Sequence, residues 1–281
     1  HAYQLLQQKQ FAEAAKEAKA LAAQFPNDPE AWKIAGFAEL NLKQYALAIV
    51  DLEKAINLQE VSKRPDINTA DALAQAYVLS EKFDRALPLL VTATTRPGAT
   101  PDPAMLYYRG LAEYKTGKLA DAERTFNAVV KANPKDSLSL FYLAQIAVGK
   151  NDLDSAISSL NRVTVNDAKF AAAWTLLTSA YLRRAALSTD STKSAADYLN
   201  AVRAGEGLIK VRTDAEAYEI AVRGDATPRQ ADQWLLVEGR WLPEPPLTSV
   251  APSSRRPVLV AEAVTPVRPP ADRYEHNLYG I

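Results

Sequence analysis

Small residues recur along the chain with a period close to 34 residues. One set stands at intervals of 34, 38, 36, 34 and 34 residues, and its members are Ala2, Gly36, Ala74, Gly110, Ala144 and Thr178. A second set keeps the first four of these intervals, and its members are Ala14, Ala48, Ala86, Ala122 and Ala156. Where two helices cross closely, a side chain larger than a methyl group would hold their backbones apart. The double register therefore predicts repeated pairs of closely packed helices.

Larger apolar residues lie between the small ones at spacings of three or four, which places them on one face of each helix. The second unit supplies Trp32, Ala35, Tyr45, Leu52 and Ala55, and the fourth supplies Leu106, Tyr114, Leu119, Phe126 and Val129. Stacked hairpins with such faces bury one continuous core. We therefore expect an all-α fold, a solenoid of helix-turn-helix units.

The pattern resembles the tetratricopeptide-repeat family, whose repeat reads Trp, Leu-Gly, Tyr, Ala, Phe and a closing Pro. The matching residues are Trp32, Gly36, Ala48 and Leu52 in one unit, Gly110, Ala122, Phe126 and Pro134 in another, and Pro26 at the end of the first. The resemblance covers about six repeats over residues 1–205, and it implies a right-handed α-solenoid that binds other proteins or peptides. The first repeat begins partway through its first helix.

A sixth repeat is expected to open with Trp174, Leu177 and Tyr181 and to pack its second helix through Ala195, Leu199 and Val202. Three features depart from the family pattern. Pro88 falls early in the second helix of the third repeat, where it is tolerable near a first turn but able to bend the axis. The connections at 59–66 and 92–102 are long and contain proline.

The composition changes after the repeats, and we divide the remainder into two segments. Residues 206–242 are expected to cap the solenoid with an amphipathic helix over 214–223 and a short hairpin over 234–241. Residues 243–281 form a Pro-rich tail, since eight of the 17 prolines lie between Pro243 and Pro270. Such a tail is expected to be extended or polyproline-like, although the apolar run 257–264 is suited to add as a strand to something.

Charge and residue inventory exclude several classes of function. Lys+Arg and Asp+Glu are both 33, so no overall field favours nucleic acid. Cysteine is absent, and the two histidines, His1 and His276, stand at the termini, so histidine-based catalysis and thiolate metal sites are not expected. No phosphate-binding glycine motif is present. Asp121, Asp152 and Asp154 are interpreted as helix-start residues. We expect no cofactor, no metal and no enzymatic activity.

The apolar stretches are too short for a membrane-spanning helix. The chain starts at His1 without a methionine, and a removed signal peptide is one explanation. Together with the Ala-rich, cysteine-free composition, this favours an exported or periplasmic bacterial protein, while a cytoplasmic location stays open.

The resemblance also implies binding positions, because in this family the first helices of successive repeats line a concave surface that holds peptides. The implied groove residues are Lys33, Phe37, Asp71, Gln75, Tyr107, Leu111, Phe141 and Gln145, with Tyr108, Tyr114 and Tyr142 nearby. The chain lacks the lysine, arginine and asparagine clamp with which some members hold a C-terminal carboxylate. An apolar or proline-containing ligand is therefore favoured. Several of these rings also suit packing between repeats, Tyr108 and Tyr142 most of all.

Four large aromatic residues of the C-terminal segments are further candidates. Trp234 and Trp241 are expected to plug the end of the solenoid, and Tyr274 and Tyr279 to contact a partner. The surface on which the tail lies is left open between the chain's own groove, a neighbouring copy and a different subunit.

Three functional hypotheses follow. The first is a structural or assembly subunit of a larger, envelope-bound complex, anchored through terminal repeats and tail. The alternative is a peptide-binding adaptor that uses the concave aromatic groove. An enzyme is the third, and no motif supports it. We favour the assembly subunit, because an ordered Pro-rich tail needs a surface to lie on.

Overall fold

A computed structural model describes residues 1–215, 219–222, 235–241 and 258–266 of the chain, and side chains as far as Leu208. The chain divides into two compact units, His1–Gly207 and Leu208–Ile281, which are described separately.

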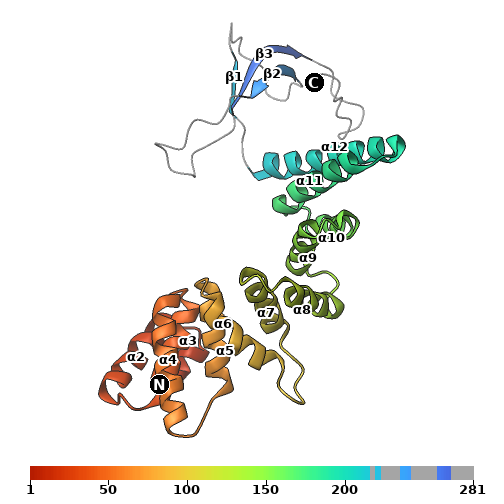
Figure 1. The fold of residues 1–281 in the computed structure, drawn as a ribbon. Coiled ribbons are helices and arrows are strands. Elements are labelled where there is room, and N and C mark those ends of the chain that lie inside the picture. The colour runs from red at the N-terminus through yellow and green to blue at the C-terminus, as the bar shows by residue number, and fades with distance from the viewer. Residues whose placement is uncertain (216–218, 223–234, 242–257, 267–281) are drawn as a thin grey trace. The chain divides into compact units, whose positions relative to one another are not determined.

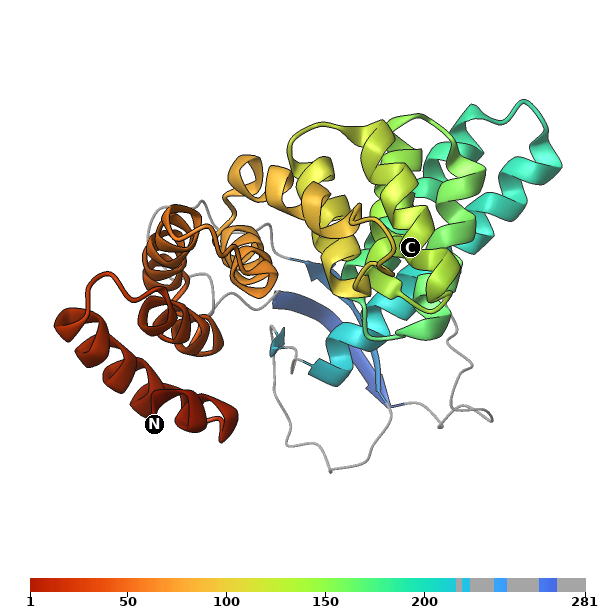
Figure 2. The same cartoon turned by 90° about the horizontal axis from the view of Figure 1, so that it is seen from below.

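Twelve helices are described, and they pair into six hairpins in chain order (Figures 1 and 2). The pairs are α1 (Ala2–Gln7) with α2 (Phe11–Gln24), α3 (Pro29–Asn41) with α4 (Tyr45–Val61), α5 (Ile67–Leu79) with α6 (Phe83–Thr94), α7 (Pro103–Lys115) with α8 (Leu119–Ala132), α9 (Ser137–Gly149) with α10 (Leu153–Asn166), and α11 (Ala171–Leu187) with α12 (Ser191–Ala215). From α1 to α11 each helix packs against the next along the chain. The expected solenoid of about six helical hairpins is confirmed.

The residues that begin and turn the hairpins recur in the same register as the small residues. An aspartate caps four of the first helices by accepting a backbone N–H, and these caps are Asp28, Asp66, Asp102 and Asp136. The turn inside each of the first five hairpins contains one residue of positive φ, and these residues are Lys9, Lys43, Glu81, Gly117 and Asn151. Local backbone chemistry therefore repeats with the packing pattern.

The small residues stand at the helix crossings, as expected. A Cβ atom added to Gly36 would lie 2.6 Å from Leu52 Cγ, and one added to Gly110 would lie 2.8 Å from Phe126 Cε1. The five alanines of the second set are wholly buried. Pro88 is accommodated within α6, which continues to Thr94.

The packing face expected for α12 is wrong. Leu199 and Val202 are 52% and 49% exposed, whereas Asp197, Ala201 and Ala204 are buried against α11. The helix has two stripes suited to burial. The stripe of smaller residues is the buried one, because Trp174 of α11 closely approaches α12, where a Cβ on Gly207 would lie 2.7 Å from the indole ring.

Among the described residues of the C-terminal unit are three strands, β1 (Glu219–Val222), β2 (Leu235–Trp241) and β3 (Val258–Pro266). They form a sheet of order β1-β3-β2, with β1 parallel and β2 antiparallel to β3. Leu259 is in register with Ile220 on one side and with Trp241 on the other.

Two expectations for this unit are corrected. No separate helix spans 214–223, because α12 continues to Ala215 and residues 219–222 form β1. Residues 234–241 are not a self-contained hairpin either. Residues 235–241 form the single strand β2, and Gly239 lies at a register irregularity opposite β3 instead of in a turn. An isolated glycine in a strand pattern marks a bulge as readily as a turn. The run 257–264 does contribute a strand, β3.

Candidate functional site

The candidate groove residues lie on the first helices of repeats two to five. Their positions are Lys33 and Phe37 on α3, Asp71 and Gln75 on α5, Tyr107, Leu111 and Tyr114 on α7, and Phe141 and Gln145 on α9. All of them are partly buried. Helices α1, α3, α5 and α7 also touch one another across successive hairpins. Three other candidate residues lie outside the described residues, namely Trp234, Tyr274 and Tyr279. The side chain of Trp241 is not described either.

Seven aromatic rings meet where α7, α8, α9 and the start of α11 come together. We call this set the aromatic face, and its members are Tyr107, Tyr108, Tyr114, Phe126, Phe141, Tyr142 and Phe170. Phe126 is wholly buried, and the other six are partly exposed. Neighbouring ring centroids are 4.9–6.5 Å apart. This is the range in which aromatic pairs attract one another.

Tyr142 is the centre of this arrangement. Its ring stacks on Phe126 with centroids 5.2 Å apart and an interplanar angle of 5°. It also contacts Tyr114 at 5.1 Å and Tyr107 at 6.5 Å. Toward the next repeat, Phe141 and Phe170 meet at 4.9 Å. The partly exposed rings are therefore fixed by a buried neighbour and by one another.

The hydroxyl groups of Tyr107 and Tyr142 remain protonated over the physiological range. Burial first, and then Tyr142, Asp136 and Tyr108, raise the pKa of Tyr107. Burial also raises the pKa of Tyr142. These rings consequently offer neutral hydroxyl groups that can both donate and accept hydrogen bonds.

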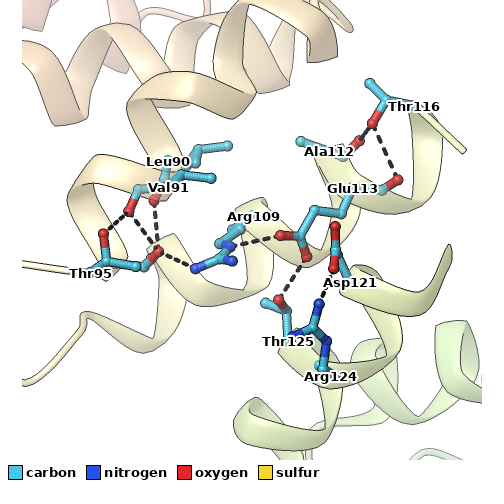
Figure 3. A network of polar contacts seen from close by, with 11 residues as sticks. Leu90, Val91, Thr95, Arg109, Ala112, Glu113, Thr116, Asp121, Arg124 and Thr125 are labelled. Carbon is cyan, nitrogen blue, oxygen red and sulfur yellow. Dashed lines mark hydrogen bonds and ion pairs between the residues drawn. The ribbon is translucent and has the colours of Figure 1, made fainter. Parts of the chain in front are cut away.

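A buried polar network sets the position of α7 between α6 and α8. Glu113 is 2% exposed, and its carboxylate accepts from Arg109 Nε at 2.7 Å and from Thr125 Oγ1 at 2.6 Å (Figure 3). Arg109 Nη1 also donates to Thr94 Oγ1 of α6 at 3.1 Å. Because Arg109 lies two residues after Tyr107, the network fixes the helix that carries the rings. Sequence reasoning missed it, since a lone Glu on a packing face gives no sign of its partners.

The aspartates near the hairpin turns act at helix starts, as interpreted. Asp152 caps α10 by accepting the Ser155 N–H at 3.1 Å, and hydrogen bonding from the Ser155 side chain, followed by its backbone N–H, lowers the pKa of Asp152. Asp121 and Asp154 stand in first turns and pair with Arg124 and Arg184. Within the described part of the chain, no group of three or more His, Cys, Asp or Glu side chains is arranged to hold a metal ion. No helix in that part is long and apolar enough to cross a membrane.

An α-solenoid with a fixed aromatic face defines a class of repeat protein that binds other polypeptides. Family comparison agrees with this class. Two models described as tetratricopeptide repeat match the chain, one at residues 1–60 and 72–137 and the other at residues 113–180. Together they cover more than half of the sequence. The chain therefore belongs to the tetratricopeptide-repeat family, whose fold serves typically as a non-catalytic platform for protein interactions, and it is a protein-interaction scaffold of that kind.

Solved structures share the fold at low identity. YrrB, described as a TPR protein with an unusual peptide-binding site, is 16% identical, with a TM-score of 0.53 over 71% of this chain and 94% of its own. A structure described as MamA MSR-1 C2 is 17% identical, with a TM-score of 0.54 over 67% of this chain and 98% of its own. No curated protein sequence matches the chain significantly. At these identities the likeness shows the fold alone.

Proposed function

We propose that the chain is an interaction scaffold that holds an extended polypeptide segment along its aromatic face. The observation that carries this proposal is the set of six partly exposed rings anchored on the wholly buried Phe126. Rings that are already fixed lose little conformational entropy when a partner packs on them, and aromatic anchors dominate the energetics of many interfaces. Gln75 Nε2 donates to the Tyr108 hydroxyl at 3.5 Å, and Gln145 lies one turn after Phe141 on α9, so both carry amide groups that suit a peptide backbone.

A random peptide library selected against the full chain tests this function. Affinities of the selected peptides are then measured by calorimetry for the wild type, Tyr107→Ala and Phe141→Ala. Each substitution is expected to weaken binding by roughly tenfold, or about 1.4 kcal/mol. Tyr3→Ala is the matched control, because Tyr3 is 56% exposed on α1, outside the aromatic face. Equal affinity in all four proteins would contradict the proposal.

A second candidate is the assembly subunit, and a separate observation favours it. Tyr198, Leu199 and Val202 form an exposed apolar stripe on α12, the helix that closes the sixth hairpin. In a repeat array, this outer face of the last hairpin is where a further repeat would pack. Anchoring through the tail, contacts of Tyr274 and Tyr279, self-association, and an envelope or periplasmic location belong to this candidate as predictions.

Size-exclusion chromatography with light scattering tests the assembly candidate. The full chain is compared with Leu199→Glu and with a chain that ends at Pro243. Loss of an oligomer in Leu199→Glu would show that the α12 stripe is an assembly contact, and loss in the shortened chain would show the same for the tail. If the wild type is monomeric alone and forms no complex when mixed with cell extract, the assembly function is contradicted.

A further inference from the structure

The charged side chain that α3 presents at a groove position is already occupied. Lys33 Nζ donates to Glu30 Oε1 at 2.8 Å and to Asp66 Oδ2 at 3.1 Å, and its side chain is only 16% exposed. Burial opposes the ammonium charge, but Glu30 and Asp66 outweigh it and raise the pKa of Lys33. Two carboxylates therefore already surround the single charge of Lys33. A ligand carboxylate at this position would lie beside Glu30 and Asp66 and would be repelled by them.

The carboxylates of the next repeats are satisfied as well. Asp71 on α5 accepts Arg96 Nη1 at 3.0 Å and also pairs with Arg96 Nη2. Asp136, which lies near Tyr107, accepts the Ser139 N–H at 2.8 Å at the start of α9. The two charged groove positions, Lys33 and Asp71, are therefore both paired, and the charge near Tyr107 is the negative charge of Asp136. What remains is aromatic, aliphatic and amide surface.

We propose that the aromatic face takes an internal, uncharged, proline-containing segment in an extended conformation, and that it does not select a terminal carboxylate. This inference rests on the function proposed above and names the chemistry of its ligand. Proline rings pack on tyrosine and phenylalanine faces, and a polyproline segment is already extended, so it loses little entropy on binding. The neutral hydroxyls of Tyr107 and Tyr142, with the amides of Gln75 and Gln145, suit its free backbone carbonyls.

An exposed cation lies on the helix that carries three of the rings. Lys115 is in the last turn of α7, which also holds Tyr107, Tyr108 and Tyr114. An acidic ligand held at the aromatic face by charge attraction would bind less tightly once Lys115 is neutralised. A Lys115→Gln variant therefore separates charge attraction from ring packing.

Fluorescence anisotropy with the full chain provides the test. The probes are labelled decaproline with an amidated C-terminus and the same peptide with a free carboxylate. Binding is measured at about 0.1 M and 1 M NaCl, which shortens the screening length from about 10 Å to about 3 Å. We expect the two probes to bind alike, with dissociation constants that change by less than about twofold between the two salt concentrations or in Lys115→Gln. Tyr107→Ala and Phe141→Ala should weaken both probes by roughly tenfold, and Tyr3→Ala should not.

Other results overturn the inference without removing the proposed function. Preference for the free carboxylate, with affinity that falls steeply in high salt or in Lys115→Gln, would show that charge selects the ligand. If neither probe binds, while the affinity of library-selected peptides still depends on Tyr107 and Phe141, the aromatic face does not select proline. If the affinity of the selected peptides is also unchanged in Tyr107→Ala and Phe141→Ala, both the inference and the proposed function are contradicted.

Discussion

At the scale of single residues, glycines at the helix crossings decide how closely two helices approach. In Gly110→Ala the new methyl group would meet the wholly buried ring of Phe126 at 2.8 Å, a clash that costs about 1–3 kcal/mol. Helix propensity offsets about 1 kcal/mol of this cost, so we expect the solenoid to lose up to about 2 kcal/mol of stability. Urea unfolding followed by circular dichroism measures the change.

Gly149→Ala is the matched control in the same experiment. No atom lies within 4 Å of the position that its Cβ would take, and it stands at the end of α9 without a positive φ. Its stability should therefore stay the same or rise by up to about 1 kcal/mol. Equal losses in the two variants would refute the role given to the crossing.

Glu39 and Asp51 form a second residue-scale feature, since both carboxylates are buried beside one lysine. Lys19 Nζ lies 2.6 Å from Glu39 Oε1 and 3.4 Å from Asp51 Oδ2, while Glu39 Oε2 and Asp51 Oδ2 lack hydrogen-bond partners. Burial raises the pKa of Glu39, and repulsion by Asp51 raises it further. Together they outweigh Lys19, which lowers it. The folded chain thus binds a proton at Glu39 more tightly than the unfolded chain does.

This difference predicts a pH dependence of stability. A raised folded pKa means that the contribution of Glu39 is present below its ordinary pKa and is lost as the pH rises through the raised value. The free energy of unfolding of the wild type should therefore fall as the pH rises from the ordinary carboxyl pKa to the raised pKa of Glu39. In Glu39→Gln this fall should be absent. Urea titrations at a series of pH values measure it, and a fall of the same size in Glu39→Gln would assign it to another group.

At the scale of elements, the helix caps differ in how many partners they hold. Asp66 accepts the Asn68 N–H at 2.9 Å and also pairs with Lys33, whereas Asp102 accepts the Ala104 N–H at 2.8 Å. Asp102→Ala should cost about 1 kcal/mol, and Asp66→Ala should cost more because α5 also loses its tie to α3. Denaturant unfolding compares the two, and an equal loss would show that the Lys33 pair adds nothing.

The Asp66 contribution is also expected to weaken in acid. Burial opposes its charge, but the Asn68 amide and Lys33 hold the pKa of Asp66 below its usual value. Its stabilisation is therefore present above the ordinary carboxyl pKa and is lost as the pH falls toward the lowered one. Hence the extra cost of Asp66→Ala should shrink in that range.

Contacts between neighbouring hairpins recur at one position. In the second, third and sixth hairpins, the residue three after the crossing residue reaches back to the preceding hairpin: Glu39 pairs with Lys19, the Tyr77 hydroxyl donates to Glu53, and the Tyr181 hydroxyl accepts from Asn161 at 3.2 Å. The chemistry differs at these three junctions although the position repeats. In the fourth hairpin the corresponding residue, Glu113, bonds within its own hairpin instead.

At the scale of the whole molecule, the solenoid is expected to fold by itself. A fragment of residues 1–215 keeps all twelve described helices. Its melting temperature should stay within about 2 °C of the solenoid transition of the full chain, and the peptide affinity of the aromatic face should be unchanged. Loss of cooperative melting in the fragment would show that the C-terminal unit supports the repeats. The division at 205 and 242 proposed from composition stays a prediction.

The sequence by itself determined the repeat and its register. Crossing residues such as Gly36 and Ala48 must be small in every hairpin, and helical periodicity fixes which residues face the core, so both constraints appear directly in the order of residues. The groove positions are implied by the family resemblance and stay a prediction. Local patterns failed at α12, where two stripes are suited to burial. They also failed at 219–222 and 235–241, because these strands pair with β3, which is distant in sequence.

Only the tertiary structure decided which side chains hold the rings and which charges are free. Glu113 meets Thr125, Lys33 meets Asp66, and Arg96 meets Asp71 because the hairpins bring them together across 12, 33 and 25 residues. Nothing in the local sequence distinguishes a paired charge from a free one. Pairing depends on distances of a few ångströms between separate helices, and those distances exist only once the core of the solenoid has packed.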